Sequence, residues 1–117
     1  MDQVSSNSGP NERRRYPRLK ANIQVAIQNE RSTAPLHAVV QDISLCGCYV
    51  ENMFTLGLGS KVLLTLWLAD RPIQASAIVV TNDPQLGNGF DFVEMNPSDR
   101  LLLHEFLRAY ELSHSGT

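Results

Sequence analysis

The chain has little of what several large classes of protein require. It has no apolar run near the roughly 20 residues that a membrane-spanning helix needs, and its first ten residues lack the apolar stretch of a secretory signal. Only two of the 117 residues are cysteines, which excludes a disulfide framework. We therefore expect a single cytoplasmic domain that is stabilised by a modest hydrophobic core.

The sequence is equally poor in metal-binding and catalytic patterns. Cys46 and Cys48 have one residue between them, so a disulfide would be strained and two thiols alone supply at best half of a zinc site. We interpret both as small buried apolar side chains, and the three widely spaced histidines as surface or helix-face residues. We find no catalytic Ser/His/Asp spacing and no phosphate-binding glycine loop, so we predict no enzymatic activity.

Charge is distributed unevenly along the chain. The net charge is −2, but residues 11–20 hold five of the ten basic residues and one acidic residue, whereas residues 21–117 hold five basic and ten acidic residues. An acidic body repels a long polyanion, while a short basic segment attracts a compact one. This pattern favours a small anionic ligand over wrapped DNA or RNA.

Alternating apolar residues and turn-forming residues predict six short strands and one terminal helix. The helix should start at Asn96-Pro97-Ser98-Asp99, where Asn caps and Pro takes the first helical position, and should end near Leu112. Its stripe of Leu103, Phe106, Leu107 and Tyr110 should face the outside or one end of a small antiparallel β-barrel. The predicted strands are 21–28, 36–44, 48–51, 61–68, 73–81 and 90–93.

Two local expectations follow from the same patterns. Residues 61–68 are apolar on both faces, so we expect this strand to be covered on both sides. Leu45-Cys46-Gly47 should form a tight turn or bulge in which Gly47 is free to take positive φ.

Two motifs carry the functional signal. Arg14 and Arg18 are four residues apart in a segment that Pro17 biases away from helix, and their guanidinium groups suit phosphates and the O6/N7 edge of guanine. Asp42-x-Ser44-x-x-Gly47 places a carboxylate and a hydroxyl on one face of a strand, if residues two apart alternate regularly. The alternative is a local turn in which both side chains cap the backbone.

Together these motifs resemble the signatures of the PilZ domain family of bacterial cyclic di-GMP receptors. The family carries Arg-x-x-x-Arg before the first strand and Asp/Asn-x-Ser-x-x-Gly between the second and third strands. It often ends its barrel on a Gly-x-Gly-hydrophobic-x-Phe strand, which Gly87-Asn88-Gly89-Phe90-Asp91-Phe92 matches. The resemblance extends from about Glu12 to Leu112.

The resemblance implies that the chain binds cyclic di-GMP, with no cofactor or metal. The paired arginines would contact phosphate and the guanine Hoogsteen edge, the Asp and Ser would meet the guanine N–H donors, and the glycines would allow close backbone approach. An arginine directly before the first motif accompanies an intercalated ligand dimer in the family, which implies two ligands per chain. The implied ligand residues are Arg13, Arg14, Arg18, Asp42, Ser44, Gly47 and Gly89.

For the organisation of the chain, we predict a disordered tail over residues 1–12, one PilZ-like domain over 13–112 and a short tail over 113–117. The arginine segment should be a flexible arm that folds over the barrel when ligand binds. With no second domain, the signal must pass to a partner protein that the sequence does not name. Two alternatives remain: a ligand-independent interaction adaptor and a small-barrel nucleic-acid-binding module.

Overall fold

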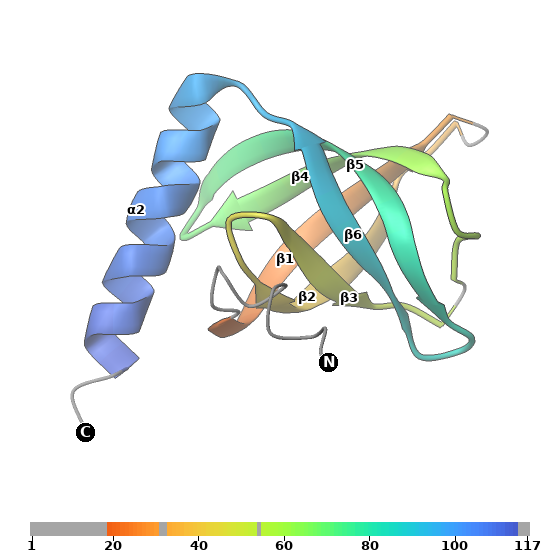
Figure 1. The fold of residues 1–117 in the computed structure, drawn as a ribbon, viewed down its shortest axis with the longest axis horizontal. Helices are drawn as coiled ribbons and strands as arrows, with labels where there is room; N and C mark the ends of the chain where they lie inside the picture. The colour runs from red at the N-terminus through yellow and green to blue at the C-terminus, as the bar shows by residue number, and fades with distance from the viewer. Residues whose placement is uncertain (1–18, 31–32, 54, 115–117) are drawn as a thin grey trace, which may run out of the picture.

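The fold is a closed six-stranded antiparallel β-barrel with one helix against it, as predicted (Figure 1). A computed structural model describes residues 19–30, 33–53 and 55–114. Around the ring the strand order is β1-β2-β3-β6-β5-β4, and pairing of β1 with β4 closes it. The strands are β1 (Leu19–Asn29), β2 (Leu36–Ile43), β3 (Gly47–Glu51), β4 (Lys61–Leu68), β5 (Arg71–Asp83) and β6 (Gly87–Glu94).

Alternation fills the barrel interior. Ile23, Val25 and Ile27 of β1 all point into the core, as their spacing predicts, and each is at most 4% exposed. The other five strands each contribute buried apolar side chains as well, so the core is one continuous cluster. Its fully buried large side chains include Ile43, Leu64, Leu66, Ile73, Val79, Phe90 and Leu103.

A bulge in β2 breaks the alternation next to the predicted binding motif. Val40 pairs with Val50 and Asp42 pairs with Tyr49, so Gln41 is an extra residue on β2. As a result, Val40 and Ile43 are both fully buried although they are three residues apart. The exposed Gln41 and the half-buried Asp42 lie between them.

The terminal helix α2 (Pro97–His114) begins as predicted. The Asn96 side-chain oxygen accepts a hydrogen bond from the backbone N–H of Asp99 at 2.8 Å, which caps the first turn. Leu103 and Leu107 are buried in the barrel core, so the helix closes one end of the barrel (Figure 1). A bond from the Gln74 N–H to the Asp99 carboxylate, at 3.0 Å, ties this end to β5.

The segment between β3 and β4 is fixed by a buried asparagine. Asn88 is fully buried; its side-chain oxygen accepts from the Leu56 N–H at 2.8 Å and its amide donates to the Leu56 and Thr81 carbonyls. Asn82 also donates to the Leu56 carbonyl, at 3.0 Å. Buried amides that are paired in this way hold a loop firmly against a barrel.

Two expectations about the strands are wrong. Strand β4 is not covered on both faces. Its outer side chains Leu63 and Trp67 are 38% and 36% exposed, because α2 lies at the barrel end instead. The hairpin of β5 and β6 is longer than predicted, because turn-prone residues are paired: Asn82 with Asn88 and Asp83 with Gly87.

The predicted tail over 1–12 and the arginine arm lie outside the described residues, as do residues 115–117. Within the described residues, the structure contains no helix with the length and apolar character to cross a membrane.

Candidate ligand-binding site

Ser44 builds the turn between β2 and β3. Its N–H donates to the Gly47 carbonyl at 2.8 Å, and its hydroxyl accepts from the N–H groups of Cys46 and Gly47 at 3.1 and 3.3 Å. The residue is only 2% exposed. For Ser44, this is the local turn that the sequence left open as an alternative. A ligand contact by Ser44 remains a prediction.

Gly47 is required by space rather than by backbone conformation. Among the described glycines, the one with positive φ is Gly59, at 84°, so the expectation of positive φ at Gly47 is wrong. Gly47 pairs with Asp91 of β6, and a Cβ at Gly47 would clash with the carbonyl oxygen of Phe90. The glycine therefore lets β3 and β6 approach each other directly below the turn.

The glycines of β6 make room for neighbouring side chains. A Cβ at Gly87 would clash with the Val50 carbonyl oxygen and would also lie 2.8 Å from the ring carbon Cε2 and from the hydroxyl of Tyr49. A Cβ at Gly89 would lie 3.0 Å from Cβ and Oγ1 of Thr81. The Gly-x-Gly pattern thus accommodates Tyr49 and Thr81, while Asn88 between the glycines points inward to its buried bonds.

Strand pairing places the predicted site residues of the barrel in one neighbourhood. Lys20 pairs with Asp42, Asp42 with Tyr49, and Tyr49 with Gly89, which forms a transverse row across β1, β2, β3 and β6. Gly47 is two residues from Tyr49 on the same strand. We call Lys20, Asp42, Tyr49 and Gly89 the binding row.

The first residue of β1 lies in this neighbourhood and directly follows the predicted arginines in the sequence. Leu19, the first residue of β1, pairs with Ile43, next to Asp42. Arg18 is covalently attached to Leu19, and adjacent Cα atoms are about 3.8 Å apart. Arg13, Arg14 and Arg18 themselves lie outside the described residues.

The binding row lies in an acidic environment. The Tyr49 hydroxyl donates to the Asp83 carboxylate at 2.8 Å. Burial, this hydrogen bond and the charges of Asp83, Asp42 and Glu51 raise the pKa of Tyr49 to about 12. Gln41 donates to Glu51 at 2.6 Å on the same side. This face presents carboxylates, which suit a partner that supplies N–H donors or positive charge.

Two clefts flank the binding row and the β2–β3 turn. The first, of about 330 Å³, is lined by Lys20, Ala21, Asn22, Gln41 and Tyr110. The second, of about 370 Å³, lies on the other side of the turn and contains Arg100, which donates to the Leu45 carbonyl at 3.3 Å. Lys20, Tyr49 and Arg100 could not be predicted from the sequence as part of this site, because their positions depend on strand register and on the placement of α2.

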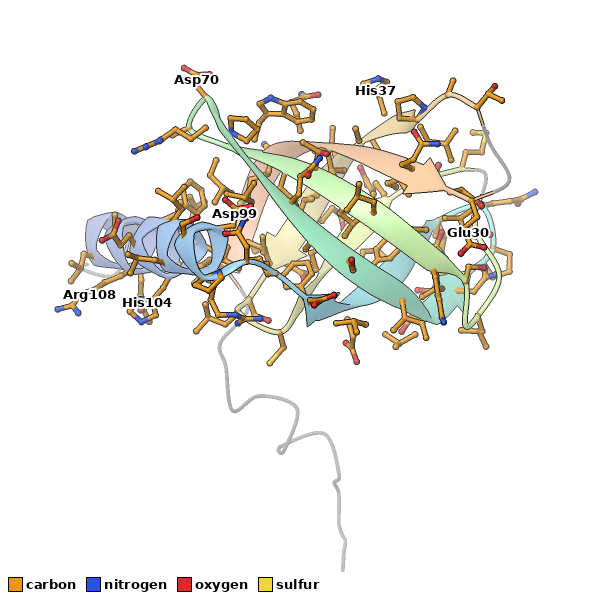
Figure 2. All side chains as sticks on the ribbon, turned by 90° about the horizontal axis from the view of Figure 1, so that it is seen from above. Glu30, His37, Asp70, Asp99, His104 and Arg108 are labelled. Carbon is orange, nitrogen blue, oxygen red and sulfur yellow. The ribbon has the colours of Figure 1, made fainter. Side chains whose placement is uncertain are left out.

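The cysteines differ in their exposure, and His37 and His104 differ in their position. Cys48 is buried in the core as predicted, whereas Cys46 is exposed in the second cleft, so the prediction for Cys46 is wrong. His37 and His104 are surface residues, as predicted, and occupy separate parts of the molecule (Figure 2). The described residues contain no group of three or more His, Cys, Asp or Glu side chains that could hold a metal ion.

The barrel fold and the β2–β3 turn together define a known class of domain. The model of the PilZ domain family matches residues 12–109, and the chain belongs to this family. No curated protein matches the sequence.

Solved structures share the fold at low sequence identity. The inhibitor of motility MotI/DgrA of Bacillus subtilis is 22% identical with a TM-score of 0.73; the match covers 86% of this chain and 52% of that one. This chain therefore spans about half of the length of MotI/DgrA. The PilZ domain of CeSA from a cellulose-synthesizing bacterium is 19% identical (TM-score 0.62), with 83% and 98% covered. The PilZ domain of YcgR from Escherichia coli, determined with c-di-GMP, is 15% identical (TM-score 0.65), with 90% and 99% covered.

Proposed function

We propose that the chain is a cyclic di-GMP receptor that passes the signal to a partner protein. The observation that carries this proposal is the binding row, which sets the Asp42 carboxylate beside the start of β1, the strand that follows the arginine segment in the sequence. Family membership and the ligand named for the YcgR domain support the choice of ligand.

The proposed division of labour follows from charge. Arg14 and Arg18 would bind phosphate and the O6/N7 edge of guanine, because a guanidinium group donates two parallel hydrogen bonds. Asp42 would accept from the guanine N–H donors on the opposite edge. Ser44 and Gly47 would hold the turn in shape, and Gly89 would let the Thr81 side chain lie close to the backbone beside Tyr49.

The acidic binding row also weighs against the nucleic-acid alternative. Asp42, Glu51 and Asp83 surround Tyr49, so a polynucleotide backbone crossing this face would be repelled. Cyclic di-GMP has only two phosphates, which the arm arginines can bind away from these carboxylates. We propose binding and signal transfer as the role of the domain, without catalysis.

The decisive experiment is a calorimetric titration of the full chain with cyclic di-GMP, cyclic di-AMP and single-stranded DNA. We expect saturable binding of cyclic di-GMP and weaker binding of the other two. A chain that binds none of them would be a ligand-independent adaptor, and preference for DNA would favour the nucleic-acid module.

The role of Asp42 can be tested in the same assay. Asp42→Ala should lower the affinity for cyclic di-GMP by at least tenfold, since a good base contact contributes about 1–3 kcal/mol of discrimination. The substitution should lower the affinity for cyclic di-AMP much less, because adenine lacks the guanine N1–H and N2 donors. Glu51→Ala, which removes a neighbouring carboxylate that the motif does not include, is the matched control. Equal loss for both nucleotides would reduce Asp42 to a structural residue.

A further inference from the structure

The outer face of the barrel at β4 and β5 carries an apolar groove that the proposed receptor function does not use. The groove has a volume of about 500 Å³, and the apolar side chains of its lining that are not buried are Leu63, Ile78 and Val93. Leu63 on β4 pairs with the small Ser76 on β5, which leaves a hollow between the larger side chains. Leu63 is 38% and Val93 66% exposed. We call Leu63, Ser76, Ile78 and Val93 the β4–β5 groove.

Within the described residues, no element covers this groove. Helix α2 closes the end of the barrel, and the binding row spans β1, β2, β3 and β6. In the ring order, β4 and β5 lie opposite β2 and β3, and β6 connects the two sides, because Asp91 pairs with both Gly47 and Ile78. A contiguous apolar surface on a small domain commonly marks an interaction site.

The charges around the groove are mostly negative. Asp91 pairs with Ile78 and Glu94 pairs with Ser76, and both acidic side chains are exposed. Glu30 lines the groove at the barrel end opposite α2 (Figure 2). Among the described residues, Lys61 is the one basic residue in the lining. A complementary occupant therefore has apolar side chains flanked by lysines or arginines.

The closed ring restricts the form of the occupant. Each described strand is paired on both sides, so no free edge is available for an added β-strand. Contact must be made through side chains, as when an amphipathic helix lies in a groove. The chain's own residues 1–12 are a poor candidate, because Met1 and Val4 are their only large apolar residues and Asp2 and Glu12 their only charged ones.

We propose that the β4–β5 groove docks a basic amphipathic helix of a partner protein. The groove would then be the output surface of the domain, and β6 would connect it to the β2–β3 turn through Asp91, which pairs with both Ile78 and Gly47. The docking surface does not require cyclic di-GMP, so it can be tested separately from the receptor function.

The test uses the full chain with labelled methyl groups and a synthetic amphipathic helix of leucines and lysines as the probe. We expect saturable shifts of the Leu63, Ile78 and Val93 methyl signals, together with a fluorescence change of Trp67, the single tryptophan, which lies on the same outer face of β4. A peptide with the same residues in a non-amphipathic order, and one with glutamate in place of lysine, should bind at least tenfold more weakly.

Matched variants distinguish binding in the groove from non-specific binding to the protein surface. Val93→Lys should lower the affinity for the leucine–lysine peptide at least tenfold, because it places a positive charge in the groove. Leu86→Lys is the control, since Leu86 is 68% exposed but lies in the β5–β6 turn outside the groove. Both variants should bind cyclic di-GMP as wild type does. Failure of wild type to bind cyclic di-GMP would overturn the receptor proposal and leave the groove proposal intact.

Several results would overturn the docking proposal itself. These are methyl shifts that map outside the groove, equal binding of the glutamate or reordered peptide, and wild-type affinity in Val93→Lys. Concentration-dependent shifts with dimers in sedimentation would make a second copy of the chain the occupant. Nuclear Overhauser contacts from residues 1–12 to the groove methyls would make the chain's own tail the occupant.

Discussion

Single residues of the β2–β3 turn serve the barrel and the proposed ligand site at once. Ser44 binds two backbone N–H groups, and Gly47 allows β3 to approach the Phe90 carbonyl. A substitution at either position disturbs the turn before it removes any contact to a ligand. Binding measurements on such variants therefore need a stability measurement beside them.

We predict that Gly47→Ala destabilises the barrel by about 1–3 kcal/mol, the usual cost of overpacking a tight site. The added methyl group meets backbone, which cannot rotate away as a side chain would. Gly57→Ala is the matched control, because the nearest atom to its Cβ would be the Ser60 hydroxyl at 4.0 Å. Denaturant unfolding measures both, and equal stability of the two variants would contradict the close approach.

Tyr49 should give a pH signature in its ionisation. Its pKa is raised to about 12, so the folded state holds the phenolic proton more tightly than the unfolded chain, whose tyrosine pKa is about 10. The corresponding stability is fully present below pH 10 and is lost as the pH rises through about 12. The difference in tyrosinate absorbance between wild type and Tyr49→Phe reports this residue alone.

Asp83→Asn tests the cause of this shift. The substitution removes the charge beside the Tyr49 hydroxyl and should lower the pKa of Tyr49, although burial, the largest cause, remains. An unchanged titration in Asp83→Asn would show that the carboxylate does not act on the phenol.

At the scale of elements, the first turn of α2 depends on its cap. Asn96→Ala removes the acceptor for the Asp99 N–H and should cost about 1 kcal/mol in the free energy of unfolding. Asn96→Asp keeps an acceptor at the same place and should retain most of the stability. Thermal or denaturant unfolding distinguishes them; an alanine variant as stable as wild type would mean that packing of Leu103 and Leu107 alone holds the helix.

Elements with strong local signals could be predicted from the sequence. The alternation of β1, the limits of β4 and the Asn-Pro start of α2 all follow from side-chain periodicity and capping, which are local. The extent of the β5–β6 hairpin could not be predicted, because Asn82 and Asp83 are turn-prone residues that pair with Asn88 and Gly87. The actual turn is shorter and includes Gln85 at φ 66°.

The candidate site was predictable in composition but not in arrangement. Asp42, Ser44 and Gly47 stand out as a motif, yet the bulge at Gln41 shifts the alternation of β2 directly before them. The binding row joins four strands, so Lys20 and Tyr49 enter it through pairings that no local pattern specifies. The inward placement of Ser44 likewise depends on the turn geometry rather than on strand alternation.

At the scale of the whole molecule, the separation of charge predicts how the arm responds to ligand. Four arginines within residues 11–18 repel each other, and two phosphates would relieve that repulsion. We expect the amides of residues 11–20 to exchange more slowly at saturating cyclic di-GMP. Fixing each residue costs about 1–2 kcal/mol in entropy, which charge-assisted contacts must exceed. Exchange that does not change on saturation would exclude closure of the arm.

Arg13 should decide the stoichiometry of binding. The family resemblance implies an intercalated ligand dimer, and a further guanidinium group can serve the second molecule. Calorimetry should give two cyclic di-GMP per chain for wild type and a value closer to one for Arg13→Leu. A single ligand bound to wild type would rule out the dimer.

Closure of the barrel has a consequence for how the protein folds. The ring is completed by pairing β1 with β4 and β3 with β6, which joins segments far apart in the chain, such as Gly47 and Asp91. Long-range pairs must overcome the entropy of closing large loops before they contribute stability, so barrels of this kind fold in milliseconds to seconds rather than in microseconds. The β2–β3 turn can form early because it is local, but its contact with Phe90 has to wait for β6 to arrive.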